Sequence, residues 1–299
     1  MTPPRPSGAA LRADLAEKGY VILKSVFPPA RLDELRTAAT HTTSAARTGV
    51  WPHVRVVGKQ FPPWDPAEAL EEGIWGVQHL LHPDLLDPDA TAFVQAYFSE
   101  EILSVVRDLL ECGDDELVME LFNMLVRPER DYELRWHRDD IPPEVTAEEE
   151  LERLREPAWH AQYNLALYPD ASLVVVPGSH TRARTDPERA AGPYEANMPG
   201  QLVVELEPGD VVFYDNNILH RGVYDSMKER MTLHGSVGHV KGKTARARNV
   251  LQHAVGEWVD RCRFEELEGE ARKRAEGMRE RLIKMGKEAG ADVGYSQKG

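Results

Sequence analysis

The chain has 299 residues, of which 41% are hydrophobic and 29% are charged, a composition typical of a globular protein with one large core or two small ones. Its formal net charge of −14 disfavours a nucleic acid partner, because an acidic protein repels phosphates. Two cysteines exclude a disulfide-rich scaffold, and no window approaches the roughly 18 apolar residues of a membrane span. We therefore expect a cytoplasmic protein that acts on a small molecule and binds neither nucleic acid nor membrane.

The N-terminal third predicts mainly helices. Residues 1–10 are expected to be a disordered lead-in. The sequence then predicts a helix at 11–18, a strand at 20–27 and a second helix at 30–40. Two consecutive helices, with a break near Ser99, are predicted at 87–110. Residues 48–76 are rich in Trp, Pro and Gly and show no period. Such a segment is typical either of a lid over a binding site or of an apolar flap over a sheet edge.

The middle of the chain predicts a series of short strands separated by turn signals, and one charged helix at 144–156. The strands are expected at 117–126, 132–136, 159–168, 172–176, 201–206, 210–214 and 230–240. This series predicts a mainly β fold with α additions, a double-stranded β-helix or jelly roll. We expect one domain over 11–288, with its jelly-roll core at about 115–240, helical additions at 29–111 and 243–288, and a loose tail at 289–299.

The phrase His137-Arg138-Asp139 comes at the end of a predicted strand. Because side chains alternate with a period of two, His137 and Asp139 point to the same side. His220 follows the apolar strand at 210–214, and a sheet can bring it to the same place. Two histidines and one carboxylate form the facial triad that binds Fe(II) and leaves positions open for a co-substrate and O₂. A zinc hydrolase can use the same ligands, so the triad alone leaves both chemistries open.

Arg230 begins the next predicted strand. The C5 carboxylate of 2-oxoglutarate needs a fixed, bidentate cation, and arginine suits that geometry. The alternative is a surface arginine that opposes Glu229 or Asp225. If Arg230 points inward, strand alternation places Thr232 and His234 on the same face.

The chain resembles the phytanoyl-CoA dioxygenase family of Fe(II)/2-oxoglutarate oxygenases over roughly residues 19–235. The resemblance rests on five features in order, namely Gly19-Tyr-Val-Ile-Leu with the helix after it, His137-x-Asp139, the turn Val176-Pro-Gly-Ser-His180, the strand that leads to His220, and Arg230. It implies His137, Asp139 and His220 as metal ligands, Arg230 as the co-substrate anchor, and Fe(II), 2-oxoglutarate and O₂ as cofactors.

The resemblance also implies an activity. A member of this family oxidises a small organic molecule and releases succinate and CO₂, and secondary metabolism is the expected setting. The retained carboxylate of Asp139 differs from the related halogenases, which carry a small residue there, so hydroxylation, desaturation or cyclisation is implied. The segment Tyr168-Pro-Asp-Ala-Ser-Leu departs from the family's acidic pair and Asn-Gly, which indicates a remodelled turn. A metal-dependent hydrolase or isomerase, or a non-catalytic binding protein on the same fold, is the alternative.

Further site residues are predicted from their positions alone. The strand residues that could contact the co-substrate are Asn123, Gln162, Tyr163 and His234, although a register slip of one residue would reverse their faces. The candidates for substrate contact lie in or after the Trp-rich segment and are Arg55, Lys59, Gln60, Gln78 and His79. We expect His180 to support the turn that carries it. The basic run at 241–248 fits a solvated helix start better than an anion site such as one for coenzyme A.

Overall fold

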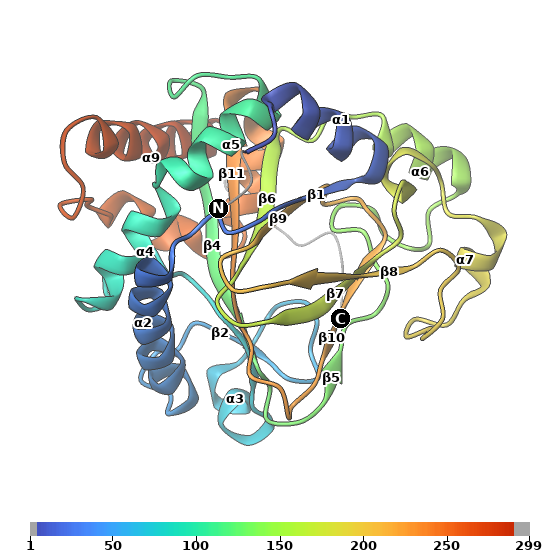
Figure 1. The fold of residues 1–299 in the computed structure, drawn as a ribbon, viewed down its shortest axis with the longest axis horizontal. Helices are drawn as coiled ribbons and strands as arrows, with labels where there is room; N and C mark the ends of the chain where they lie inside the picture. Colours follow the sequence, from blue (N-terminus) through green and yellow to red (C-terminus); the bar gives the residue numbers. More distant parts are fainter. Residues whose placement is uncertain (1–4, 290–299) are drawn as a thin grey trace.

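The computed structural model describes residues 5–289, which form two antiparallel sheets that face each other as a jelly roll (Figure 1). The larger sheet has the strand order β1 (Tyr20–Leu23), β9 (Val211–Tyr214), β6 (His160–Ala166), β11 (Met231–His239), β4 (Leu117–Val126), β3 (Ile74–Val77) and β2 (Val54–Val56). The smaller sheet has the order β5 (Tyr132–Glu133), β10 (His220–Tyr224), β7 (Asp170–Val175) and β8 (Leu202–Leu206). The predicted fold class is confirmed.

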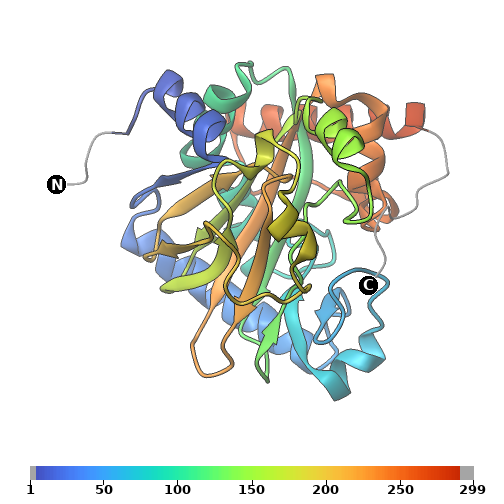
Figure 2. The same cartoon turned by 90° about the vertical axis from the view of Figure 1, so that its right-hand side faces the viewer.

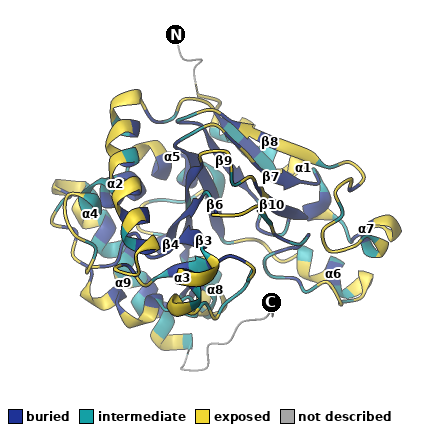
Figure 3. Ribbon diagram, turned by 90° about the horizontal axis from the view of Figure 1, so that it is seen from below, coloured by how far each residue is buried: buried dark blue, intermediate teal, exposed yellow. Residues whose placement is uncertain are grey.

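Helices surround the larger sheet on its outer side and at its ends (Figures 1 and 2). These are α1 (Gly8–Lys18), α2 (Pro29–Arg47), α4 (Asp89–Tyr97), α5 (Glu100–Leu110), α8 (Lys243–Leu251) and α9 (Gly269–Ala289). The helices α6 (Ala147–Leu154) and α7 (Asp186–Ala190) lie beside the smaller sheet, and α3 (Pro66–Glu72) lies beyond β2. Figure 3 shows the consequence: the central strands are buried, the outer faces of the helices are exposed, and β8 lies largely exposed at the edge.

The side chains of strand β6 alternate between the two faces of the larger sheet. Ala161, Tyr163 and Leu165 join the core between the larger sheet and the helices. Gln162 and Asn164 point the other way, into the space between the sheets, because adjacent side chains alternate. A smaller apolar cluster closes one end of this space, and a polar pocket occupies the rest. The alternation therefore leaves a cavity between the sheets that is lined from both sides.

The N-terminus differs from the expectation. Helix α1 begins at Gly8, because Ser7 caps it by accepting a hydrogen bond from the Ala10 amide at 3.3 Å, so residues 8–10 are not disordered. Residues 1–4 of the expected lead-in and 290–299 of the expected tail lie outside the described residues. The strand expected to reach residue 27 ends at Leu23, since Ser25 takes a positive φ of 52° and turns the chain.

The Trp-rich segment contains two strands, and the larger sheet includes strands that lie outside residues 115–240. Strands β2 and β3 extend the larger sheet, and β1 pairs with β9 at its other edge. Strands β2 and β3 have only three and four residues, which is too short to show a period in the sequence. Strand β10 was also not predicted, because Arg221 and Gly222 interrupt its apolar pattern. Within residues 5–289, no helix combines the length and hydropathy that crossing a membrane requires.

Candidate metal centre

The three predicted ligands converge at the edge of the smaller sheet. The backbones of His137 and His220 pair in an isolated bridge, in which each amide donates to the other carbonyl at 3.0 Å. Their Nε2 atoms lie 3.4 and 3.6 Å from Oδ1 of Asp139. The three ligand atoms lie within 4.8 Å of one another, which is the arrangement that a single metal ion requires.

The hydrogen bonds of both imidazoles leave Nε2 available for a metal. His137 Nδ1 lies 2.9 Å from the Arg135 carbonyl oxygen, and His220 Nδ1 lies 2.8 Å from that of Ile218. A carbonyl oxygen only accepts, so each Nδ1 carries the proton and each Nε2 presents its lone pair. Burial, reinforced by the charge of His137, lowers the pKa of His220 to about 4, so its ring is neutral at neutral pH.

A hydrogen bond also orients the carboxylate of Asp139. Gln162 Nε2 donates to Oδ2 of Asp139 at 3.1 Å, which leaves Oδ1 facing the two imidazoles. Burial raises the pKa of Asp139, but its interactions with His137 and His220 and the hydrogen bond from Gln162 outweigh this, so its pKa lies below the usual range. Asp139 is therefore an anion at neutral pH and a competent ligand.

Arg138, between the two ligands, points away from them into the protein and is fully buried. Its Nε donates to Oε1 of Glu150 on α6 at 2.7 Å, and its terminal nitrogens donate to the carbonyls of Ser179 and Arg182 at 3.0 Å and to that of Asn217. Glu150 is also fully buried and takes further ion pairs from Arg184 and Arg189. The metal motif is thus fixed to α6, the turn after β7 and the segment before His220.

Arg230 points into the pocket, and the predicted division of faces is confirmed. Arg230 and His234 line the pocket, whereas Met231 and Leu233 pack in the helix-side core. The guanidinium is buried and lies 4.4 Å above the ring of Tyr224. The alternative, a surface arginine opposing Glu229 or Asp225, is not what the structure shows.

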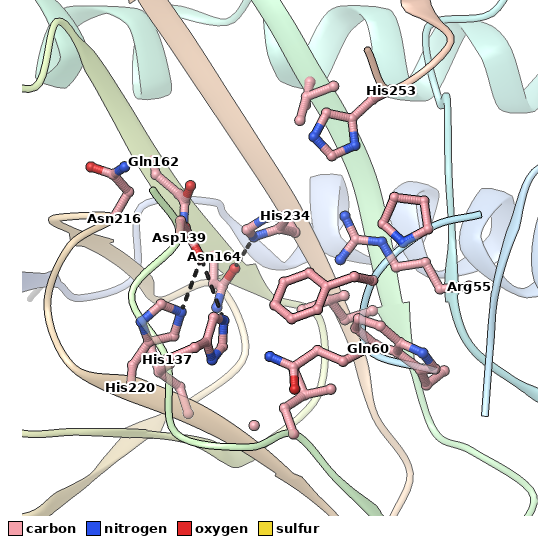
Figure 4. A pocket seen from close by; sticks show the side chains of 18 of the residues that line it. Arg55, Gln60, His137, Asp139, Gln162, Asn164, Asn216, His220, His234 and His253 are labelled. Atoms are coloured by element: carbon pink, nitrogen blue, oxygen red, sulfur yellow. Dashed lines mark hydrogen bonds and ion pairs between the residues drawn. The ribbon is translucent and has the colours of Figure 1, made fainter. Parts of the chain in front are cut away.

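Four other predicted residues line the pocket together with the triad and Arg230: Arg55, Gln60, Gln162 and His234 (Figure 4). Arg55 lies across the cavity from the triad and stacks 5.0 Å from the ring of Trp75 and 5.5 Å from that of Trp64. The Trp-rich segment thus supplies one wall, as the lid interpretation expected.

Two of the other predicted substrate residues are engaged elsewhere. Lys59 is half-exposed and pairs with Glu68 at 2.6 Å. Gln78 donates to the Val54 carbonyl oxygen at 3.1 Å, which holds the loop after β3 against β2. Neither residue lines the pocket, because each bonds to a partner in the Trp-rich segment that lies away from the cavity.

The predictions for His79, Asn123 and Tyr163 also require correction. Asn123 Oδ1 accepts the His79 amide at 2.9 Å, and the His79 ring contacts the His253 carbonyl oxygen at 2.7 Å, so both side chains are used in packing. Tyr163 takes the outer face of β6 and joins the helix-side core. His180 bonds the Ala16 carbonyl oxygen at 3.1 Å, away from the triad, in agreement with the supporting role predicted for it.

Sequence reasoning missed further pocket residues. Asn164 lies two positions from Gln162 on β6, so alternation could have identified it. No local pattern marked the remaining polar members, which are Asp140, Ser172, Tyr214, Asn216, Tyr224, Arg246, Asn249, Gln252 and His253. The basic run at 241–248 is thus not uniformly solvated, because Arg246 faces the pocket.

A family model described as "Phytanoyl-CoA dioxygenase (PhyH)" matches residues 15–226, a range that contains the triad and ends just before Arg230. A search of curated proteins gave no match.

Solved structures with a similar fold include AviO1 from Streptomyces viridochromogenes Tue57, at 18% identity and a TM-score of 0.54, covering 78% of this chain and 95% of that one. EctD from S. alaskensis, in a structure with 2-oxoglutarate and 5-hydroxyectoine, has 18% identity and a TM-score of 0.56, covering 80% and 79%. The epimerase SnoN from nogalamycin biosynthesis has 15% identity and a TM-score of 0.52, covering 78% and 83%.

Replacing Glu150 with alanine should destabilise the protein, because it leaves the buried Arg138 guanidinium without its carboxylate. We expect the free energy of unfolding to fall by about 3–5 kcal/mol in a denaturant titration. Glu152→Ala, an exposed change on the same helix, should cost less than about 1 kcal/mol. Equal stability of the two variants would contradict the anchoring role of Glu150.

Replacing Asp139 with alanine should weaken Fe(II) binding by at least about 100-fold, because a direct ligand is removed. An anaerobic Fe(II) titration measures this, with circular dichroism to confirm that the fold is kept. Asp115→Ala, an exposed aspartate in the turn before β4, serves as the control and should bind metal like the wild type. Near-normal affinity of Asp139→Ala would refute the triad.

Proposed function

Because the chain belongs to the phytanoyl-CoA dioxygenase family, we propose that it is a non-haem Fe(II)/2-oxoglutarate-dependent dioxygenase that oxidises a small organic molecule, with release of succinate and CO₂. The observation that carries the proposal is a buried arginine that faces the same pocket as a His-Asp-His triad. In support, EctD was solved with 2-oxoglutarate, and SnoN with Fe³⁺ and α-ketoglutarate.

The residues present fit a divalent iron. The triad offers two imidazole nitrogens and one carboxylate oxygen on one side, and its open side faces the pocket. Bound iron and 2-oxoglutarate would supply the oxidising power for cleavage of a substrate C–H bond. Gln162 orients Asp139, and the backbone carbonyls orient the two imidazoles, so the ligands need no rearrangement on metal binding.

The residues also fit a dicarboxylate. Nη1 of Arg230 is buried and makes no hydrogen bond to any residue in the described part of the chain. Leaving such a donor unpaired is costly, so the guanidinium is prepared to receive an anion. Leu125 and Leu134 line the same pocket and give it apolar walls. If its C5 carboxylate bound Arg230 and its keto acid bound the metal, both ends of 2-oxoglutarate would have a partner in the pocket.

Asp170 positions Arg230 for this task. Its Oδ1 accepts from Arg230 Nε at 3.2 Å and from the Ser172 amide at 3.1 Å, and its Oδ2 accepts from Thr232 Oγ1 at 3.1 Å. Asp170 lies in the segment that departs from the family pattern, and this turn therefore contributes to the co-substrate side. With Nε occupied by Asp170, the guanidinium can offer only its terminal nitrogens to a ligand.

The substrate is proposed to enter between the triad and the Trp-rich segment. Phe61 lies with its ring 6.0 Å from that of His137, and Trp64 and Trp75 continue the wall. These aromatic side chains exclude water from the reacting atoms, which protects an oxidising site from side reactions. Asp139 keeps its carboxylate, so the proposed outcomes are hydroxylation, desaturation or cyclisation. Secondary metabolism is the proposed setting, since SnoN comes from nogalamycin biosynthesis.

Arg230→Ala should raise the 2-oxoglutarate concentration needed for half-saturation by roughly 100-fold, because a charge-assisted pair is lost. Arg230→Lys should recover part of this, since it keeps the charge and loses the planar fork. The measurement is an anaerobic titration of the iron-to-oxoglutarate charge-transfer band, with Fe(II) affinity as the control. Equal titrations of wild type and Arg230→Ala would rule out the anchor. Absence of the band from the wild type would refute the oxygenase and favour a hydrolase or a binding protein.

Asp170→Asn should weaken 2-oxoglutarate binding by roughly 10-fold, because an amide holds the Arg230 guanidinium less firmly than a carboxylate does. At saturating 2-oxoglutarate, turnover should return to near the wild-type rate, since Asp170 touches no reacting atom. Steady-state KM and kcat for 2-oxoglutarate, measured as succinate formation, separate the two effects. A fall in kcat with an unchanged KM would show that Asp170 serves stability and not the position of Arg230.

A further inference from the structure

Arg246 is an unexplained cation in the pocket. It lies in α8, beyond the residues that the family model matches, so no role for it is inherited from the family. Its side chain is only 13% exposed, and it lines the same cavity as His137, Asp139 and His220. Neither the metal ligands nor the residues around Arg230 bond to it.

A buried carboxylate holds Arg246 in place. Arg246 Nε donates to Glu120 Oε1 at 2.8 Å and Nη2 donates to Oε2 at 2.6 Å, a bidentate pair with a carboxylate that is 1% exposed. Gly238 on β11 leaves room for the pair, because a Cβ atom at that position would overlap Oε1 of Glu120 in its present position. Nη1, the remaining nitrogen, has no hydrogen bond or ion pair to any residue between 5 and 289. The guanidinium is therefore rigid and has a free donor.

A fixed acceptor lies on the same wall. Asn249 is three residues after Arg246 on α8, so the two side chains share a helix face. Asn249 Nδ2 donates to Asp140 Oδ1 at 3.0 Å, and Asn216 Nδ2 donates to the other oxygen of Asp140. Asp140 lines the pocket, and each of its oxygens keeps further acceptor capacity. The wall thus presents a cationic donor and an anionic acceptor, each held by protein hydrogen bonds.

We infer that Arg246 and Asp140 form the substrate-binding pair, and that the substrate carries an oxyanion next to an N–H or O–H donor, as in an amino acid or a hydroxy acid. The oxyanion binds Nη1 of Arg246, and the neighbouring donor binds Asp140. Charge balance favours this class over a simple anion, because the carboxylates of Glu120, Asp140 and the metal ligand Asp139 already interact electrostatically with Arg246. The aromatic residues of the Trp-rich segment face the rest of the molecule.

This inference rests on the proposed function only for the statement that the pocket receives the substrate, and binding can be tested without turnover. The probes are the proteinogenic L-amino acids, their 2-hydroxy acid counterparts, the corresponding amines without a carboxylate, and the corresponding acids without the amino or hydroxyl group. Each is titrated calorimetrically into wild-type protein loaded with Mn(II) and 2-oxoglutarate, and into Mn(II)-loaded protein alone.

At least one amino acid or hydroxy acid should bind the wild type more tightly than its matched amine or simple acid. Preference for the amino acid or for the hydroxy acid identifies the donor that Asp140 receives. Arg246→Lys keeps a cation for Glu120 but loses the planar fork, and should weaken this ligand by roughly 10-fold or more. Asp140→Asn should reduce the preference for an ammonium group. Arg248→Lys, an exposed change on α8, should leave the affinity within about twofold.

The inference is overturned if no member of the panel binds the wild type, or if Arg246→Lys binds the ligand as the wild type does. Failure of the proposed function is a separate result, in which the wild type does not bind 2-oxoglutarate at all. Even in that case, the pair of Arg246 and Asp140 would be supported if Mn(II)-loaded protein without 2-oxoglutarate bound a ligand and Arg246→Lys weakened that binding.

Discussion

The buried ion pair of Arg138 with Glu150 is the interaction on which the rest of the site depends. Strand alternation that directs His137 and Asp139 towards a metal must direct the residue between them into the protein. Burying a guanidinium is costly unless all its donors are satisfied, and here they reach one carboxylate and three carbonyls from two separate segments. Arg138, which alternation directs away from the metal, thus connects α6, the turn after β7 and the chain before His220. The geometry of the triad follows from that connection.

The same arrangement recurs at the two other arginines that define the pocket. Arg230 is held by Asp170, and Arg246 is held by Glu120, in each case through Nε. A guanidinium that is fixed on one side retains a defined direction for the donors on its other side, so less conformational entropy is lost when a ligand binds. Three buried carboxylates on three different elements therefore determine where the metal, the co-substrate and the substrate can lie.

Features that a local motif or pattern marks were predictable from the sequence, and contacts between distant residues without such a mark were not. The jelly roll was predicted from the series of short strands with turn signals, and the triad and Arg230 were predicted from the order of their motifs along the chain. Tyr163 was placed wrongly, because only the register of β6 against its neighbours decides which face reaches the pocket. Arg246 looked solvated because its partner Glu120 lies 126 residues earlier in the chain. Such a pair leaves no periodic signal.

The two halves of the pocket are built from different kinds of structure, and this has a consequence for specificity. His220 begins β10, which pairs with β5 and β7, and Arg230 directly precedes β11, which pairs with β4 and β6, so sheet ladders fix the backbone at both places. The substrate side is built from the Trp-rich segment, which includes Arg55 of β2 and Trp75 of β3, and from α8, which lies outside the two sheets. Changes on α8 can therefore alter what the pocket accepts while the sheet hydrogen bonds that hold the triad stay intact. Glu120 is the exception, because this residue of β4 links the substrate side to the larger sheet.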